Sequence, residues 1–222
     1  MENNVKTLAL YLDGPMQSWG CQSQFDRRTT LAYPTKSGVI GMLCAALGID
    51  RSDTTSIASL AALSMKVLCL SQISRWTDYH TVGAGYDRDS DKQHRPRKAD
   101  GGTRKDAVVS RREYLSDARF GVLLSGDGTL LNRCDKALQD PRWGIWFGRK
   151  SCIPASPITQ GVFNDHPNAI SVLSRCSNGR IYRIITDESD HEQVTDFLSD
   201  NPINYASRTF TVRQVTVDDV SD

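Results

Sequence analysis

The 222-residue sequence lacks the features that mark several broad classes of protein. No apolar run approaches the roughly 18 residues that a membrane helix needs. The polar start at Met1–Asn4 lacks the charged and then apolar plan of a signal peptide. No internal repeat or low-complexity segment occurs, and the content of 39% hydrophobic and 24% charged residues is ordinary for a globular chain. We therefore expect a folded cytoplasmic protein with no membrane partner.

The sequence also lacks the spacings typical of metal and redox sites. No two of the six cysteines form a CxxC pair, and no histidine pair has the spacing of metal ligands. We therefore expect no metal and no cofactor, and we expect the thiols to be reduced and mostly buried. The cysteines are Cys21, Cys44, Cys69, Cys134, Cys152 and Cys176.

A large charge of one sign is missing as well, since the formal net charge is only +1. This average conceals segregation along the chain. Residues 88–112 contain nine Lys and Arg against four Asp, whereas residues 187–222 contain nine acids against two Arg. The basic charge is therefore local, and it predicts a polyanion contact at one place rather than over the whole surface.

Apolar periodicity predicts a mixture of strands and helices. The helix predicted over Thr35–Leu47 has one nearly bare face, formed by Ser37, Gly38, Gly41 and Ala45. We therefore expect another part of the protein to pack close to its backbone. The predicted strands are Val5–Leu12, Met65–Ile73, Tyr114–Leu124, Ile181–Ile185 and Phe210–Val217, and the predicted helices are Thr35–Leu47 with Gly48 as C-cap, Thr129–Gln139 and Ser189–Leu198.

The segment Arg75–Arg111 loses periodicity, and a loop of that length is rare in a compact domain, which favours a projecting hairpin or a partly mobile arm. The remaining order is most of the βαββαβ plan of an α+β, ferredoxin-like sheet, whose open face often carries single-stranded RNA. We expect this domain to span residues 1–74 and 112–160, with residues 75–111 inserted and residues 161–222 forming a small β-rich C-terminal extension.

Gly148-Arg149-Lys150-Ser151 is similar to the end of a phosphate loop, but Gly144 leaves three intervening residues where that motif needs four. One interpretation is a turn with two exposed cations. The other is a cradle in which the glycine N–H and both cations hold a backbone phosphate. Trp143 and Trp146 nearby favour the cradle because aromatic rings beside cations suit unstacked bases, although Trp143 could equally be a core residue.

Two other places carry candidate chemistry. Lys36 and Ser37 start the bare helix and form a potential anion site, where Ser37 could also act only as a cap. Arg27 and Arg28 precede it in a loop and could add charge. Tyr79-His80 is the best candidate for acid and base in metal-independent RNA cleavage, although a lone histidine in a charged arm is more often a surface or RNA-contacting group.

Five motifs in a fixed order resemble one family. They are Gly14-Pro15-Met16-Gln17-Ser18-Trp19-Gly20, Tyr33-Pro34-Thr35-Lys36-Ser37-Gly38 with Gly41, Asp78-Tyr79-His80-Thr81-Val82, Arg112-Glu113-Tyr114-Leu115-Ser116-Asp117-Ala118, and Gly148-Arg149-Lys150-Ser151-Cys152. Their order and separations resemble the Cas-five subunits of type I-E CRISPR surveillance complexes, called Cascade. The resemblance covers about residues 8–160 and is faint beyond Gly161.

The resemblance implies a RAMP-type, ferredoxin-like domain that binds the five-prime handle of the CRISPR RNA (crRNA) and caps the CasC backbone. Residues 75–111 would then be the family's thumb, a β-hairpin arm. The other implied partners are the large subunit CasA and, through the assembled complex, target DNA. Arg112 and Leu115 would contact and wedge the guide, Trp146 would replace a handle-binding tyrosine, and Arg149 and Lys150 would meet handle phosphates. The implied RNA-binding residues are Gln17, Trp19, Arg27, Lys36, Ser37, His80, Arg111, Arg112, Leu115, Trp146, Arg149, Lys150 and Ser151.

The resemblance further implies a subunit that is not an enzyme, because type I-E systems assign repeat cleavage to a separate endoribonuclease. Two alternatives stay open at this point. Type I-C relatives cut the repeat themselves, and here Tyr79, His80 and Lys92 would be the candidates for metal-independent cleavage. The second alternative is a free-standing protein that binds single strands, although a long charged arm with few apolar anchors should order only against another subunit.

Overall fold

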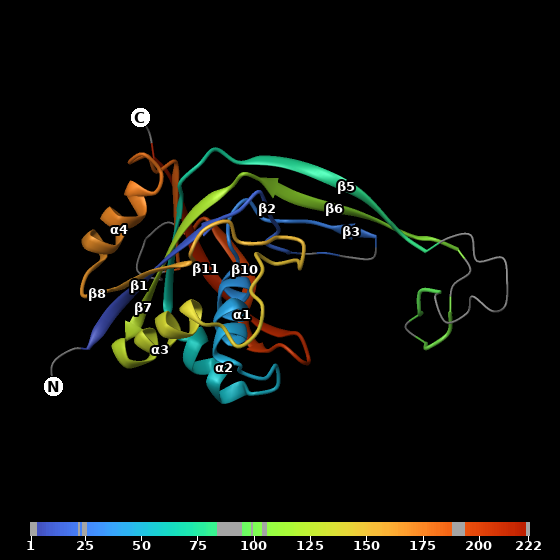
Figure 1. Cartoon of the computed structure of the whole chain (residues 1–222), viewed down its shortest axis with the longest axis horizontal. Helices are drawn as coiled ribbons and strands as arrows, with labels where there is room; N and C mark the ends of the chain where they lie inside the picture. Colours follow the sequence, from blue (N-terminus) through green and yellow to red (C-terminus); the bar gives the residue numbers. More distant parts are fainter. Residues whose placement is uncertain are drawn as a thin grey trace.

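The computed structural model describes residues 4–21, 23, 26–83, 95–98, 100–103, 106–187 and 194–220. In this part of the chain, two sheets and four helices form a mixed α/β structure (Figure 1). The seven-stranded sheet contains β1 (Val5–Asp13), β4 (Ser64–Cys69), β7 (Arg119–Asp127), β8 (Thr159–Phe163), β9 (Arg183–Thr186), β10 (Asp196–Asn204) and β11 (Thr209–Asp219). The smaller sheet contains β2 (Met16–Gln17), β3 (Arg27–Arg28), β5 (Ser74–Val82) and β6 (Val108–Ser116), and the helices are α1 (Lys36–Leu47), α2 (Thr54–Ala61), α3 (Gly128–Gln139) and α4 (His166–Arg175).

The strands of the large sheet run in the order β10-β11-β9-β4-β7-β1-β8, and each neighbouring pair is antiparallel. Strand β1 lies between β7 and β8, with Leu10 opposite Val122 of β7. The C-terminal strands continue this sheet, because β9 pairs with both β4 and β11. The sheet therefore joins the first residues of the chain to the last.

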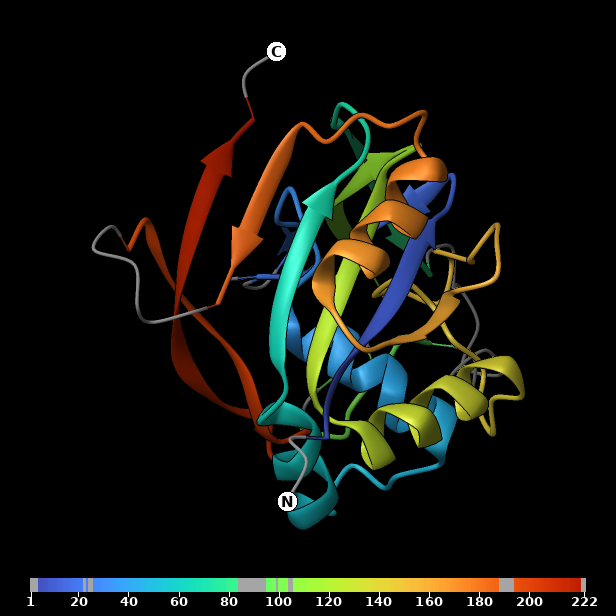
Figure 2. The same ribbon diagram turned by 90° about the vertical axis from the view of Figure 1, so that its left-hand side faces the viewer.

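Hydrophobic layers cover both faces of this sheet. Side chains alternate along a strand, so Leu10 of β1 faces one layer with Ile40 of α1 and Leu131 of α3. Tyr11 faces the other layer, where Leu173 of α4 packs. Figure 2 shows α4 across the near face of the sheet with α1 behind it. Burial on both faces explains the almost continuously apolar sequence of β1.

The smaller sheet is built around β6. Strand β5 pairs with β6 along its whole length, from Ser74 opposite Ser116 to Val82 opposite Val108. This two-stranded ribbon extends away from the large sheet (Figure 1). The short strands β2 and β3 pair with β6, β2 antiparallel and β3 parallel.

The predicted first strand and the two predicted helices in the first 140 residues are confirmed. The side chain of Thr35 caps α1 by accepting the N–H of Gly38, and Gly48 ends the helix at φ 71°. The bare face of α1 is also contacted closely, as predicted. A Cβ at Gly38 would lie 2.9 Å from the ring of Trp19, and one at Gly41 would lie 3.6 Å from the hydroxyl oxygen of Tyr205.

Two predicted strands have different ends. The segment predicted as one strand over Tyr114–Leu124 is divided between two sheets, because Asp117 turns the chain at φ 48° and its N–H binds the carbonyl of Pro15. The strand predicted over Met65–Ile73 ends at Cys69. In both cases apolar residues continue past the point where the backbone leaves the sheet.

The predicted helix over Ser189–Leu198 is wrong in its described part. Residues 188–193 lie outside the described residues, and Asp196–Leu198 begin strand β10. Alternate residues Leu198, Asp200 and Pro202 are buried there, as a strand requires. The period of two is hidden in the sequence because two of these buried residues are an aspartate and a proline.

Among the described residues, no helix combines the length and apolar character needed to span a membrane.

Candidate nucleic-acid interface

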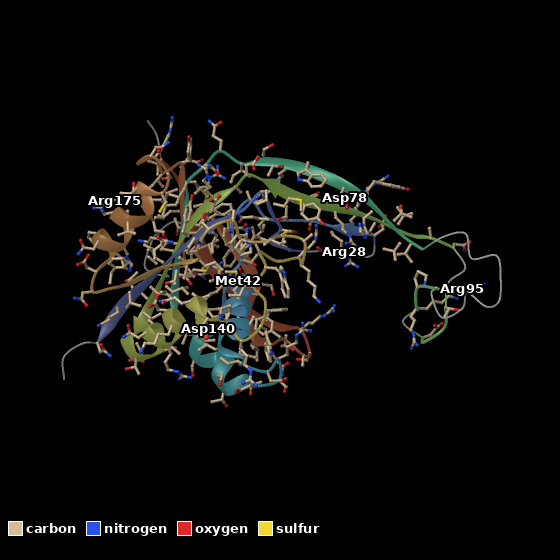
Figure 3. All side chains as sticks on the ribbon, viewed as in Figure 1. Arg28, Met42, Asp78, Arg95, Asp140 and Arg175 are labelled. Carbon is tan, nitrogen blue, oxygen red and sulfur yellow. The ribbon has the colours of Figure 1, made fainter. Side chains whose placement is uncertain are left out.

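The root of the β5–β6 ribbon forms one wall of an open groove of about 580 Å³. Residues directly opposite each other on two strands share a face of the sheet. Trp76 lies opposite Tyr114, and Asp78 lies opposite Arg112. Figure 3 shows Asp78 on this ribbon with Arg28 on the strand beneath it. The groove is lined by Met16, Trp76, Asp78, His80, Arg112, Tyr114, Arg149, Lys150 and Ser151.

A stack of planar groups forms the floor of the groove. The rings of Trp76 and Tyr114 lie with centroids 5.0 Å apart and planes tilted by 20°. The guanidinium of Arg149 lies 4.6 Å from the centroid of Tyr114. Both the indole and the guanidinium therefore pack on the tyrosine ring. Tyr114 is 5% exposed and Trp76 is 40% exposed, so Trp76 presents the open end of this stack.

Arg149 also ties the turn at residues 148–151 to the smaller sheet. Its Nη1 donates to the carbonyl of Glu113 on β6 at 2.8 Å, and its Nη2 donates to the carbonyl of Arg28 on β3 at 2.9 Å. The guanidinium thus has three contacts within the chain. By contrast, Lys150 is exposed, with its Nζ 5.6 Å from the ring centroid of Trp146.

Gly148 fits its turn because it has no side chain. Its φ is 92°, and a Cβ there would lie 1.8 Å from the carbonyl oxygen of Ser18. The N–H of Gly148 donates to the carbonyl of Trp146, so it does not face outward to an anion as the predicted cradle requires. Burial raises the pKa of the neighbouring Cys152 thiol, which is consistent with a protonated core residue.

Three of the sequence motifs meet around Trp19. Its indole is 1% exposed, its ring centroid lies 6.0 Å from that of Phe147, and its edge lies against Gly38 of α1. The Nε1–H of Trp19 donates to Oε1 of Gln17. The amide of Gln17 in turn donates to the carbonyls of Leu12 and Ala118. This cluster places the turn at residues 148–151 against the root of the ribbon.

The buried positions of Gln17, Trp19 and Leu115 give these side chains a supporting role in the fold. Gln17 and Leu115 are each 0% exposed. All three were expected to contact RNA, but in this structure they have almost no surface to offer a nucleotide. Leu115 lies on the core face of β6. Its neighbour in sequence, Tyr114, points to the opposite face of the strand, which lines the groove.

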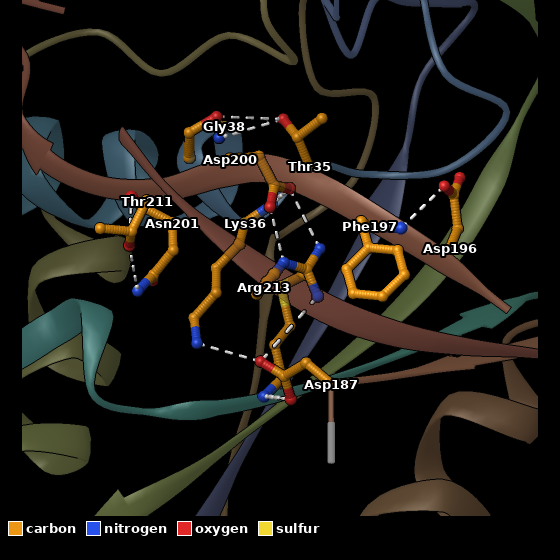
Figure 4. Close-up of polar contacts among 12 residues, drawn as sticks. Thr35, Lys36, Gly38, Asp187, Asp196, Phe197, Asp200, Asn201, Thr211 and Arg213 are labelled. Atoms are coloured by element: carbon orange, nitrogen blue, oxygen red, sulfur yellow. Dashed lines mark hydrogen bonds and ion pairs between the residues drawn. The ribbon is translucent and has the colours of Figure 1, made fainter. Parts of the chain in front are cut away.

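The predicted anion site at the start of α1 is filled by carboxylates of the chain itself (Figure 4). The N–H of Lys36 donates to Asp200 at 2.7 Å, and the Nζ of Lys36 binds Asp187 at 3.0 Å. Arg213 holds Asp200 through two hydrogen bonds of 2.6 and 3.0 Å. Lys36 is therefore buried and paired, and the carbonyl of Ser37 accepts a bond from Tyr205.

Arginines from two distant parts of the chain lie side by side next to the groove. Arg27 and Arg28 were expected in a loop, but they form β3 and pair with Arg111 and Arg112 of β6. In a parallel pair these residues are neighbours across about 5 Å. Arg27, Arg28 and Arg111 are exposed. Arg28 and Arg112 share the groove face with Asp78, whereas Arg27 and Arg111 share the opposite face with Tyr79.

Tyr79 and His80 do not come together as an acid and base pair. They are neighbours on β5 and therefore point to opposite faces of the ribbon. Tyr79 is 64% exposed on the back, whereas His80 lines the groove with its Nδ1 3.4 Å from Oδ2 of Asp78. Lys92, the third candidate for cleavage, lies outside the described residues.

Sequence reasoning missed Trp76, Asp78 and Tyr114 as residues of the groove. The alternation of side chains along β5 could have placed Trp76, Asp78 and His80 on one face. Their junction with Tyr114 depended on the register with β6, and that register is not readable from the sequence.

Comparisons with known proteins agree on one family. The family model described as CRISPR-associated protein (Cas_Cas5) matches residues 7–216. The CRISPR system Cascade subunit CasD of Escherichia coli (strain K12) is 35% identical over 169 residues, which covers 70% of this chain and 69% of that protein.

Solved structures give the same result. A chain of a CRISPR RNA-guided surveillance complex matches with a TM-score of 0.78 and 29% identity, over 96% of this chain and 90% of that one. A structure described as a Cas protein matches with a TM-score of 0.66 and 29% identity, over 96% and 94% of the two chains.

Proposed function

The chain belongs to the Cas5 family of CRISPR-associated proteins, and from this premise we propose that it is the crRNA-binding subunit of a type I-E Cascade surveillance complex. It would hold the five-prime handle of the crRNA and would not cut RNA. The observation that carries the proposal is the groove at the ribbon root, where an open aromatic face lies beside cations. Such surfaces bind single-stranded RNA by stacking bases and neutralising phosphates.

The proposed fold assignment is a ferredoxin-like RAMP domain carrying a thumb. It is supported by the strand order β4-β7-β1-β8, which is the spatial order 2-3-1-4 of a βαββαβ unit, with α1 and α3 packed in one layer. The β5–β6 ribbon would be the thumb, inserted between β4 and β7. Under this assignment β9, β10 and β11 extend the same sheet rather than forming a separate body.

The proposed contact residues are those that the fold leaves accessible around the groove. Lys150, Arg28 and Arg112 would bind phosphates on the groove side, and Arg27 and Arg111 would bind them on the other face of the strands. Trp146, which is 36% exposed, would offer a ring to a base. Arg149 would act mainly by positioning, because its donors already bind main-chain carbonyls. The accessible predicted residues are Arg27, His80, Arg111, Arg112, Trp146, Lys150 and Ser151.

The proposed partners follow from the relatives. The chain would bind the crRNA and other subunits of the complex. Among these subunits we propose CasC of the backbone and the large subunit CasA, and the assembled complex would also contact target DNA. A cytoplasmic location fits such an assembly. Cleavage of repeat RNA is not favoured, because the candidate acid and base lie on opposite faces of β5.

The test is retention of guide RNA by the Lys150→Ala variant, co-expressed with the other complex subunits and a CRISPR array. Loss of one phosphate contact should reduce the amount of guide RNA that co-purifies. The plot of log affinity against log salt concentration should also become less steep, with its negative slope smaller in magnitude by about 0.7. Lys136→Ala, at the last turn of α3, is the matched control and should change neither. Guide RNA absent from the wild-type complex, or held by it without contact to this subunit, would refute the proposal.

A further inference from the structure

The groove contains one carboxylate among its cations. Asp78 lines the same groove as Arg112, Arg149 and Lys150, and it is the only acidic side chain among the described residues that line it. A carboxylate repels phosphate, so its place in a groove for a polyanion needs another reason. Its side chain is 33% exposed, and within the described part of the chain only Oδ2 has a partner, the Nδ1 of His80. Oδ1 remains available as an acceptor.

The neighbouring indole defines where a base would lie. Tyr114 contacts both Trp76 and Arg149 and is only 5% exposed, so its ring offers no surface to a base. In the part of the chain that the structure describes, no ring or cation stacks on the outer face of Trp76. A base stacked there would add one more layer to an existing column. Asp78 is two residues along the same strand, about 7 Å away and on the same face.

We infer that Trp76 and Asp78 form a subsite for one RNA base that bears an exocyclic amino group, namely cytosine, adenine or guanine. The inference rests on the proposed function, and it adds base selection by these two residues. The base stacks on the indole, and its amino group donates to Oδ1 of Asp78. The Nδ1 of His80 lies 3.4 Å from Oδ2, which leaves Oδ1 as the oxygen that faces the base. Uracil binds less tightly because it has no amino group, and its single N3–H donor lies between two carbonyl oxygens that the carboxylate repels.

The experiment measures binding of the purified full chain to labelled RNA octamers of cytidine, adenosine or uridine by fluorescence anisotropy. The wild type should bind the cytidine and adenosine octamers about tenfold more tightly than the uridine octamer, as expected for one good hydrogen-bonded contact to a base edge. Asp78→Asn should bind all three within about twofold of one another, because an amide can accept from an amino group and donate to a carbonyl. Trp76→Ala should weaken all three by about tenfold or more.

Asp140→Asn, at the end of α3, is the control that removes one carboxylate outside the groove, and it should keep the wild-type preference. The inference is overturned if the wild type shows no preference for amino-bearing bases or if Asp78→Asn keeps that preference. Retention of guide RNA by the wild-type complex separates the two proposals. If the wild-type complex retains guide but the wild-type chain shows no base preference, the subsite alone is removed, whereas a wild-type complex without guide removes the proposed function.

Discussion

At the scale of single residues, the two cations of the 148–151 turn have different tasks. Arg149 donates hydrogen bonds to the carbonyls of Glu113 and Arg28, and its guanidinium packs on the ring of Tyr114. Lys150 keeps its ammonium group near Trp146 and open to solvent. A sequence motif that looks like a paired phosphate site therefore contains one arginine tethered to the main chain and one exposed lysine beside Trp146. The lysine is the residue whose removal should affect binding without loosening the fold.

Gly148 is the residue on which the position of this turn depends. Gly148→Ala should lower the free energy of unfolding by about 2–4 kcal/mol, because a left-handed backbone carries a methyl group poorly and this methyl would collide with Ser18. Urea denaturation followed by circular dichroism measures the change.

Gly179→Ala separates backbone strain from collision. Gly179 has a similar φ of 82°, but no described residue comes within 4 Å of the Cβ position. Gly179→Ala should therefore lower the free energy of unfolding by about 1 kcal/mol. Equal losses at the two positions would show that the contact with Ser18 is unimportant.

At the scale of secondary-structure elements, α1 is anchored by charges from the end of the chain. Asp200 of β10 accepts the N–H of Lys36 and is held by Arg213 of β11. Asp200 is 6% exposed, so its charge is compensated almost entirely inside the protein. The acidic C-terminal segment thus supplies the anion that the start of α1 favours.

Asp200→Asn should lower the free energy of unfolding by about 3 kcal/mol, because it removes the nearer of the two carboxylates that Arg213 contacts and leaves only Asp187, at 3.9 Å. Asp53→Asn is the matched control, since Asp53 caps α2 from an exposed position where asparagine caps equally well. That change should be within about 0.5 kcal/mol of the wild type. Urea midpoints of the two variants give the comparison, and similar values for both would contradict the role of Asp200.

The elements that the sequence predicts well are those with local signals. Helix α1 has a cap at each end, and β1 has an unbroken apolar run. The turn at Asp117 was missed because an aspartate rather than a glycine takes the positive φ, and apolar residues continue beyond it. The groove was found only in part. Lys150 and Trp146 are close in sequence, whereas Trp76 and Tyr114 meet through strand register.

At the scale of the whole molecule, strand pairing is continuous across the seven-stranded sheet from the N-terminal to the C-terminal strands. Val67 of β4 lies opposite Val122 of β7 on one side and Ile185 of β9 on the other. Ile185 in turn lies opposite Val217 of β11 and is 1% exposed in the core shared with β1. Because contacts of this kind are lost together, residues 4–21 and 194–220 should unfold in one transition.

Ile185→Ala tests this continuity through the tryptophans, since all four lie at or before residue 146. Loss of the buried side chain should destabilise the protein by about 2–5 kcal/mol. The urea midpoint of tryptophan fluorescence should fall with it, although no tryptophan lies in the C-terminal strands. Ile203→Ala, on the exposed face of edge strand β10, should leave that midpoint nearly unchanged. If Ile185→Ala instead shifted only the far-ultraviolet circular dichroism and spared the fluorescence transition, the C-terminal strands would be a separate folding unit, and a groove at the ribbon root would not depend on them.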